Sequence, residues 1–210
     1  MPCGSRSATV SFNKRTISSA YYLQEGRAMH TDAQETSAAL PADDPSRQLA
    51  VARPDDPDLV HLAVVGDTYT VLIDGEQTAG RFAMIDMLVP PGGGPPPHRH
   101  AFEECFRVLE GSIEVHLRDQ PPVRLEAGES ANIPANAPHA FRNTAEVPAR
   151  LLCTVSPSGL ERFFAEFGDP VPSRTSPAPD LTDAERQDRL RRAMEKAPEY
   201  GMEILPPPPG

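Results

Sequence analysis

Residues 92–111, GGGPPPHRHAFEECFRVLEG, place two histidines one residue apart and a glutamate four residues after the second, with glycines at both ends. Residues i and i+2 of a β-strand face the same side, so His98 and His100 can point inward together while Arg99 points away. Glu104 follows a short turn at the same parity. Two imidazoles and one carboxylate bind divalent transition metals and leave coordination positions open for a substrate or dioxygen. These three residues are therefore candidate metal ligands.

A second segment, AGESANIPANAPHAFRN (residues 127–143), supplies a fourth candidate ligand, His139. Together the two segments resemble the cupin family, whose signatures are G(X)5HXH(X)3-4E(X)6G and, after a spacer, G(X)5PXG(X)2H(X)3N. The first signature is matched at Gly92, His98, His100, Glu104 and Gly111. The second is matched at Gly128, Pro134, His139 and Asn143, with Asn136 in place of the remaining glycine. Asparagine is among the few residues that tolerate the positive φ for which glycine is used.

The resemblance covers about residues 83–155 and implies an all-β fold, the double-stranded β-helix or cupin jelly-roll barrel. It also implies that one divalent transition metal per chain, Fe, Mn, Ni, Cu or Zn, is held by His98, His100, Glu104 and His139. Imidazoles and a carboxylate that converge inside a barrel are costly to bury without a cation, which favours the same expectation.

The first motif is similar to that of single-domain bacterial cupins described as quercetin-dioxygenase-like. This resemblance implies a metal-dependent oxygenase that acts on a small aromatic or enol-type molecule, with Glu104 as both a metal ligand and a catalytic proton acceptor. Strand parity predicts an apolar substrate pocket lined by Phe102, Phe106, Val108 and Phe141. Two alternatives stay open: a non-catalytic module that binds a small ligand, and a metal-dependent isomerase of sugars or sugar acids.

Residues 58–168 are predicted to form the barrel and a helix that closes it. From residue 58 to 157 the chain consists of about eight short β-rich runs separated by Gly, Pro, Asn and Asp, a pattern typical of a sandwich or barrel. The helix is indicated by the helical spacing of Leu160, Phe163, Phe164 and Phe167. Ser158, three residues before Glu161, has the spacing of a capping box.

The two ends of the chain are predicted to be flexible tails. Residues 169–210 are interpreted as a proline-rich linker and a second helix, with a capping box at Thr182 and Glu185 and a thin apolar stripe of Leu190 and Met194. The basic run ERQDRLRR in this helix is interpreted as a solvated face. Residues 1–57 are interpreted as a disordered or loosely packed extension in which Met29 is a possible alternative start.

Composition excludes several classes of function. The formal net charge is −10, which disfavours nucleic-acid binding, and no apolar run is long enough to span a membrane. Three widely spaced cysteines do not suggest a disulfide framework, and Cys105 and Cys153 are expected in the core. His30, His61 and His116 lack partners at ligand spacing. We expect a cytoplasmic protein with a small-molecule substrate, paired into a homodimer through the apolar alternation of residues 81–89, RFAMIDMLV.

Overall fold

The computed structural model of the protein describes residues 40–54 and 56–206. The chain divides into two units, Met1–Asp43 and Asp44–Gly210, and the architecture below belongs to the second. The predictions made for Met29 and His30, and for the rest of residues 1–39, lie outside the described residues. In the described part of the chain, no helix has the length and apolar character required to cross a membrane.

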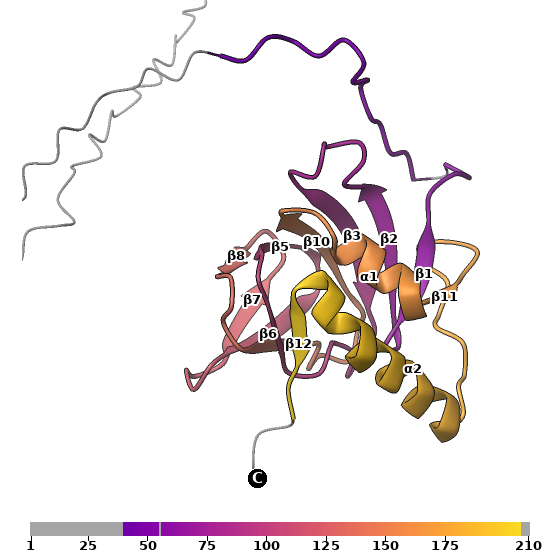
Figure 1. Ribbon diagram of the computed structural model, residues 1–210. Helices are drawn as coiled ribbons and strands as arrows, with labels where there is room; N and C mark the ends of the chain where they lie inside the picture. Colours follow the sequence, from indigo (N-terminus) through magenta and orange to yellow (C-terminus); the bar gives the residue numbers. More distant parts are fainter. Residues whose placement is uncertain (1–39, 55, 207–210) are drawn as a thin grey trace, which may run out of the picture. The chain divides into compact units, whose positions relative to one another are not determined.

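The described chain contains twelve short strands, ten of them before the first of its two α-helices (Figure 1). The strands are β1 (His61–Val64), β2 (Asp67–Ile73), β3 (Ala83–Val89), β4 (His98–His100), β5 (Glu103–Glu110), β6 (Ser112–Leu117), β7 (Val123–Glu126), β8 (Ser130–Ile133), β9 (His139–Arg142), β10 (Ala149–Ser156), β11 (Asp169–Pro170) and β12 (Met202–Ile204). The helices are α1 (Leu160–Phe167), α2 (Asp183–Lys196) and the 3₁₀ helix η1 (Ala197–Tyr200).

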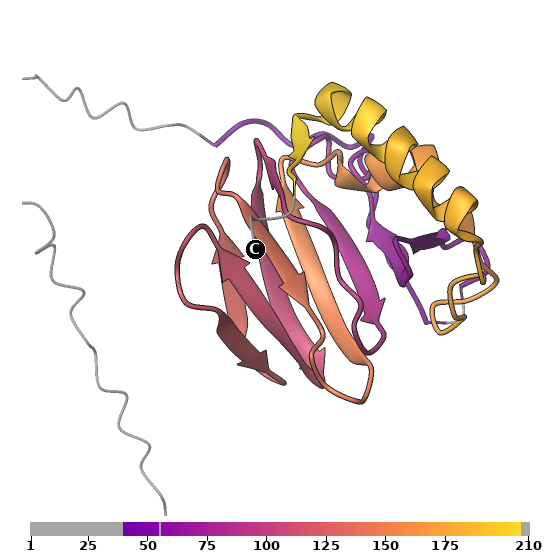
Figure 2. The same ribbon diagram turned by 90° about the horizontal axis from the view of Figure 1, so that it is seen from below.

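The strands form two antiparallel sheets. One has the order β11-β1-β2-β3-β10-β5-β8 and the other has the order β12-β4-β9-β6-β7. Their strands are seen from below in Figure 2. The core is made of inward side chains from both sheets, among them Ile85, Phe106, Ile113 and Leu151. The predicted cupin jelly-roll fold is thus confirmed.

Strand β5 shows why parity decides burial. Its buried positions alternate with exposed ones, so Glu104 and Phe106 point inward, as predicted, while Glu103 and Arg107 point outward. Cys105 is exposed by the same alternation, so the expectation that it belongs to the core was wrong. An apolar run alone does not reveal the face of a strand, whereas its parity relative to Glu104 does.

Helix α1 buries Leu160, Phe163, Phe164 and Phe167, as its spacing predicts. The predicted capping box at Ser158 is wrong, because the N-cap is Gly159 and has no side-chain cap. With φ of 141°, Gly159 places Ser158 one residue outside the helix. The carboxylate of Glu161 instead accepts hydrogen bonds from the amides of Gly159 at 2.8 Å and Gly75 at 3.1 Å.

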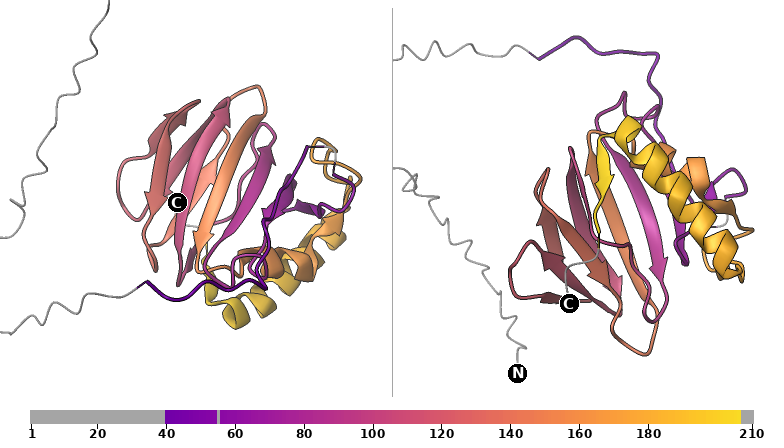
Figure 3. Two further views of the ribbon diagram at one scale, coloured as in Figure 1. Left: turned by 90° about the horizontal axis from the view of Figure 1, so that it is seen from above. Right: turned by 60° about the horizontal axis from the view of Figure 1, so that its bottom comes forward.

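The C-terminal segment 169–206 contains α2 and two strands that the sequence did not indicate. The capping box of Thr182 and Glu185 is confirmed. Leu190 and Met194 are 42% and 52% exposed, and the buried contact of α2 is made by Ala193. Strand β11 pairs with β1 and β12 pairs with β4, so this segment adds an edge strand to each sheet. Helices α1 and α2 lie side by side in the two views of Figure 3.

The apolar alternation of residues 81–89 does not form an exposed surface. It forms β3, in the middle of the seven-stranded sheet, and Ala83, Ile85, Met87 and Val89 are buried in the core. Met84 and Leu88, on the other face, are only half-buried. The expectation of an exposed apolar contact there was wrong, because most of the alternating apolar side chains point into the core and the other face carries the buried Asp86 between Met84 and Leu88.

Candidate metal centre

The four predicted ligands lie together between the sheets. His98 and His100 come from β4, and His98 is paired directly with His139 on β9. Glu104 comes from β5 of the other sheet. One ligand atom from each residue lies within 4.8 Å of the others, and all four side chains are buried. Residues from both sheets are therefore needed to complete the cluster.

Backbone carbonyls orient the three imidazoles in the same way. The Nδ1 atoms of His98, His100 and His139 lie 2.9 Å from the carbonyl oxygens of Pro96, Phe102 and Ala137, respectively. A carbonyl oxygen can only accept, so each Nδ1 carries the donated proton. Each neutral ring consequently directs the lone pair of its Nε2 atom to the cluster, which is the tautomer that a metal ligand needs.

The ligating atoms of the cluster have no hydrogen-bond donor among them, so they are unsatisfied unless a cation lies between them. Oε2 of Glu104 is 3.1 Å from Nε2 of His100 and 3.2 Å from Nε2 of His139. With their protons on Nδ1, these nitrogens and the carboxylate would oppose one another as acceptors. Two ligand atoms held about 2.1 Å from one ion at right angles lie roughly 3.0 Å apart, close to the observed separations. The residues therefore fit a divalent transition metal.

Electrostatics within the cluster keep His98 and Glu104 in the forms that bind metals. Burial lowers the pKa of His98 to about 4, and the nearby His139 acts in the same direction while Glu104 opposes it. Burial acts to raise the pKa of Glu104, but the nearby rings of His100 and His139 outweigh it and hold that pKa well below its usual range. A neutral imidazole and an ionised carboxylate are the forms that bind metals.

Two motif residues shape the backbone around the cluster. Asn136, which replaces the usual glycine, has φ of 64°, as the turn requires. Asn143 is fully buried and donates to the carbonyls of Val89 at 3.0 Å and Val147 at 2.8 Å. Its backbone also pairs with Gly92 and Gly93, so the end of the second motif is joined to the start of the first.

A cavity of about 450 Å³ opens from the cluster, with His98 and Glu104 among its lining residues. Its wall is mainly apolar and aromatic and includes Tyr69 and Phe141. Of the predicted pocket residues, Phe141 lines this cavity, whereas Phe102, Phe106 and Val108 are buried but are not among its lining residues. The ring of Phe102 is stacked on that of His100, with centroids 3.9 Å apart.

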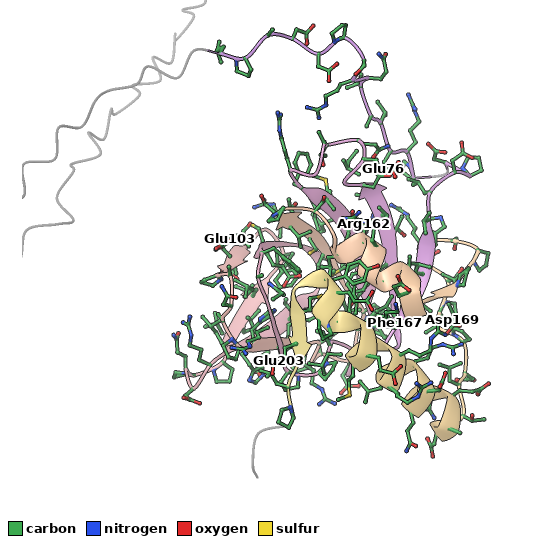
Figure 4. All side chains as sticks on the ribbon, viewed as in Figure 1. Glu76, Glu103, Arg162, Phe167, Asp169 and Glu203 are labelled. Atoms are coloured by element: carbon green, nitrogen blue, oxygen red, sulfur yellow. The ribbon has the colours of Figure 1, made fainter. Side chains whose placement is uncertain are left out.

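Much of the cavity wall comes from segments that sequence spacing does not connect with the motifs. Helix α1 supplies Phe163, Phe164 and Phe167, α2 supplies Leu190 and Ala193, and β12 supplies Met202 and Ile204. Figure 4 labels Phe167 and Asp169 at the end of α1, beside α2. Asp169 accepts two hydrogen bonds from Arg189 of α2, at 2.6 and 3.1 Å. The helical spacing in α1 and the capping box of α2 indicated the helices but not the surface that they cover.

Two facing antiparallel sheets with three histidines and a glutamate converging between them are the arrangement of a cupin barrel. A family model described as a cupin domain matches residues 85–155. Protein SchB of Streptomyces halstedii is 39% identical over 114 residues, which cover 54% of this chain and 82% of SchB. The chain belongs to the cupin family.

Two further relatives extend the comparison. Quercetin 2,3-dioxygenase of Bacillus subtilis is 27% identical over 121 residues, which cover 57% of this chain but only 35% of the dioxygenase. Among solved structures, an RmlC-like cupin from Shewanella frigidimarina has a TM-score of 0.46 at 17% identity, covering 55% of this chain and 96% of that one.

Proposed function

We propose that the protein is a metal-dependent oxygenase that acts on a small aromatic or enol-type molecule. One observation carries the proposal: a buried cluster of three imidazoles and one carboxylate opens into an apolar cavity with an aromatic wall. A volume of about 450 Å³ lies within the usual range of small-molecule sites, so a compact ring system can enter it. The distant similarity to a quercetin 2,3-dioxygenase supports the same reaction class.

We assign one divalent metal per chain, Fe, Mn, Ni, Cu or Zn, to His98, His100, Glu104 and His139. When bound, such a metal supplies Lewis-acid binding of a substrate oxygen and a position for dioxygen beside it. Glu104 lines the cavity and would accept the proton of a substrate hydroxyl that reaches it. The aromatic wall would orient the substrate ring and exclude water.

The metal content of the protein tests the first part of the proposal. Wild type purified without added metal is compared by elemental analysis with His100→Ala, which removes one ligand, and with His116→Ala, which removes a partly exposed histidine outside the cluster. We expect metal in the wild type and in His116→Ala, and much less in His100→Ala. A wild-type content below about a tenth of an ion per chain, under conditions that keep similar sites loaded, would contradict the proposed site.

The reaction is tested with the metal-loaded protein. Quercetin and 2,4-pentanedione are titrated anaerobically while the spectrum of the metal is followed, and oxygen uptake is measured after air is admitted. We expect a spectral change with at least one probe, followed by oxygen uptake that His100→Ala lacks. A spectral change without oxygen uptake would favour a non-catalytic binding module. Spectral changes only with sugars or sugar acids would favour the isomerase.

A homodimer and a cytoplasmic location remain part of the proposal. Because β3 does not present an exposed apolar surface, the dimer has no contact assigned to it within the described residues. Size-exclusion chromatography with light scattering at micromolar concentration checks the dimer, and a monomer at that concentration would remove it from the proposal.

A further inference from the structure

Asp67, the first residue of β2, is a fully buried carboxyl group outside the metal cluster. Its Oδ2 accepts a hydrogen bond from the hydroxyl of Tyr69 at 3.0 Å. Among the described residues, no partner meets hydrogen-bond geometry at its Oδ1. A buried oxygen without a partner is uncommon in native proteins and requires an explanation.

Tyr69 connects this carboxyl group with the cavity. Its side chain lines the same cavity as His98 and Glu104, and its ring lies 5.0 Å from that of Phe164 between centroids. Burial, then Asp67, and then the charges of Cys153 and Glu104 hold the pKa of Tyr69 well above its usual range. Tyr69 therefore keeps its proton, and only the direction in which that proton is donated can change.

The protonation of Asp67 decides this direction. Burial raises the pKa of Asp67 to about 7, against the lowering effects of the Tyr69 hydroxyl and of the Gly94 amide, which lies near the carboxyl group without meeting hydrogen-bond geometry at Oδ1. The groups that face the pair are the backbone of Gly93 and Gly94, before β4, and on the side of Tyr69 the side chains of Glu104 and Cys153. Of these groups, Asp67 is the one that changes charge near neutral pH.

We propose that Asp67 and Tyr69 form a switchable hydrogen-bond pair behind the cavity wall, in which Tyr69 donates to a ligand oxygen when Asp67 is protonated. In that state the O–H of Asp67 donates to Tyr69, and the phenolic proton is free to turn to the cavity. When Asp67 is ionised, its carboxylate accepts the hydrogen bond of the Tyr69 hydroxyl. The hydroxyl oxygen of Tyr69 then presents only acceptor lone pairs to the cavity. The inference rests on the proposed function, because it requires a ligand with an acceptor oxygen, such as a carbonyl or enolate, in this cavity.

The pair itself is tested without a ligand. In protein labelled with ¹³C at aspartate carboxyl carbons, the resonance of Asp67 is assigned by its loss in Asp67→Asn and followed with pH. We expect Asp67 to titrate near neutral pH, and at higher pH in Tyr69→Phe, because that variant lacks the hydrogen bond that stabilises the carboxylate. Titration of Asp67 in the range of an exposed aspartate would overturn the inference.

The effect on the cavity is tested by binding of 3-hydroxyflavone to the metal-loaded protein, followed by the fluorescence of the flavonol. In Asp67→Asn the amide N–H₂ donates to Tyr69 at every pH and holds the phenolic proton toward the cavity. At each pH the wild-type affinity is divided by the Asp67→Asn affinity. In this ratio the effects of ionisation of the probe and of the metal-binding residues cancel, because they are the same in both proteins. We expect this ratio to fall about tenfold from slightly acid to slightly alkaline pH, the loss of one hydrogen bond.

Two phenylalanine variants provide the comparison. Tyr69→Phe removes the donor, so its affinity should be about tenfold below that of Asp67→Asn at all pH values. Tyr200→Phe is the matched control, because the Tyr200 hydroxyl bonds to Glu166 and does not line the cavity, and it should bind as the wild type does. Thermal unfolding of each variant shows whether it is folded.

The outcomes separate this inference from the proposed function. Flavonol binding that is unaffected by Tyr69→Phe, with a ratio that does not vary with pH, would overturn the switch and leave the oxygenase proposal standing. If the metal-loaded wild type binds no flavonol while Asp67 still titrates near neutral pH, a flavonol-type ligand is ruled out. Both proposals depend on such a ligand, so this outcome would contradict both.

Discussion

Cys153 donates its thiol hydrogen to Oε1 of Glu104 at a distance of 3.3 Å, while Oε2 of the same carboxylate faces His100 and His139. Burial and the neighbouring Glu104 raise the pKa of Cys153 well above its usual range, so the thiol stays protonated and remains a donor. Cys153 thus distinguishes the two oxygens of Glu104, because it donates to Oε1 and leaves Oε2, which faces the histidines, free for a metal.

Cys153→Ala should therefore weaken metal binding without unfolding the barrel. Partners of ligands typically change metal affinity by about tenfold or more, and a weak thiol donor belongs at the low end of that range. Cys153→Ser, which retains a donor, should recover part of the loss, and Cys105→Ala, at an exposed position on the neighbouring strand, should have no effect. Competition with a chelator measures the affinities. Equal affinities in all four proteins would remove the positioning role of Cys153.

Asn143 should behave as a structural residue rather than a ligand. Asn143→Ala leaves the carbonyls of Val89 and Val147 without their donor inside the protein, which should cost about 3 kcal/mol of unfolding free energy. Metal content per folded chain should stay at the wild-type value. Urea unfolding and elemental analysis measure the two quantities, with Asn132→Ala on an exposed position as the control. A stable variant that has lost its metal would contradict this assignment.

Strand β12 should support the ligand strand β4. Ile204 is paired with His98 and Met202 with His100, whereas β4 meets its other neighbour, β9, in one pair. A chain that ends at Gly201 should therefore bind metal at least about tenfold more weakly, because the histidines lose the neighbour that orients them. Glu203→Ala breaks only the exposed pair with Arg99 and should change stability by less than about 1 kcal/mol. Undiminished metal affinity in the shortened chain would show that β4 is held without β12.

Asp67→Asn should change how stability depends on pH. An aspartate whose pKa is raised to about 7 in the folded state, from 3.8, contributes stability that is complete below the unfolded value and is lost as pH rises between the two. The loss is on the order of 4 kcal/mol. Asp67→Asn should therefore be more stable than the wild type above about pH 7, and similar to it near pH 4. Urea midpoints over this range measure the difference, and parallel curves would contradict the raised pKa.

Ala193→Phe should narrow the cavity from the side of α2. Ala193 is 2% exposed and lines the cavity, so a large side chain there must either enter the cavity or displace the helix. We expect 3-hydroxyflavone to bind much more weakly while 2,4-pentanedione, which is smaller, still binds. Met194→Phe, on the exposed face of the same helix, is the control. Equal loss of both probes would indicate a displaced helix, which circular dichroism and the unfolding midpoint would reveal.

Local sequence patterns determined the strand-rich barrel and the identity of its candidate ligands. Alternation with a period of two places Glu104 and Phe106 on the inner face of β5, because successive side chains of a strand point to opposite faces. The same rule, applied relative to Glu104, would also have placed Cys105 outside. The turn at Asn136 was predictable for a related reason, since few residues other than glycine adopt positive φ.

Only the tertiary structure decided which distant residues meet. Glu104 joins the three histidines from the opposite sheet, Cys153 reaches Glu104 across neighbouring strands, and Tyr69 faces the same cavity from β2. The wall supplied by α2 and the pairing of β12 with β4 likewise have no local signal. The sequence of the proline-rich linker does not specify where the segment after it packs. Residue spacing specifies the face of one strand, but the register between strands and the covering of a cavity follow from the packing of the whole core.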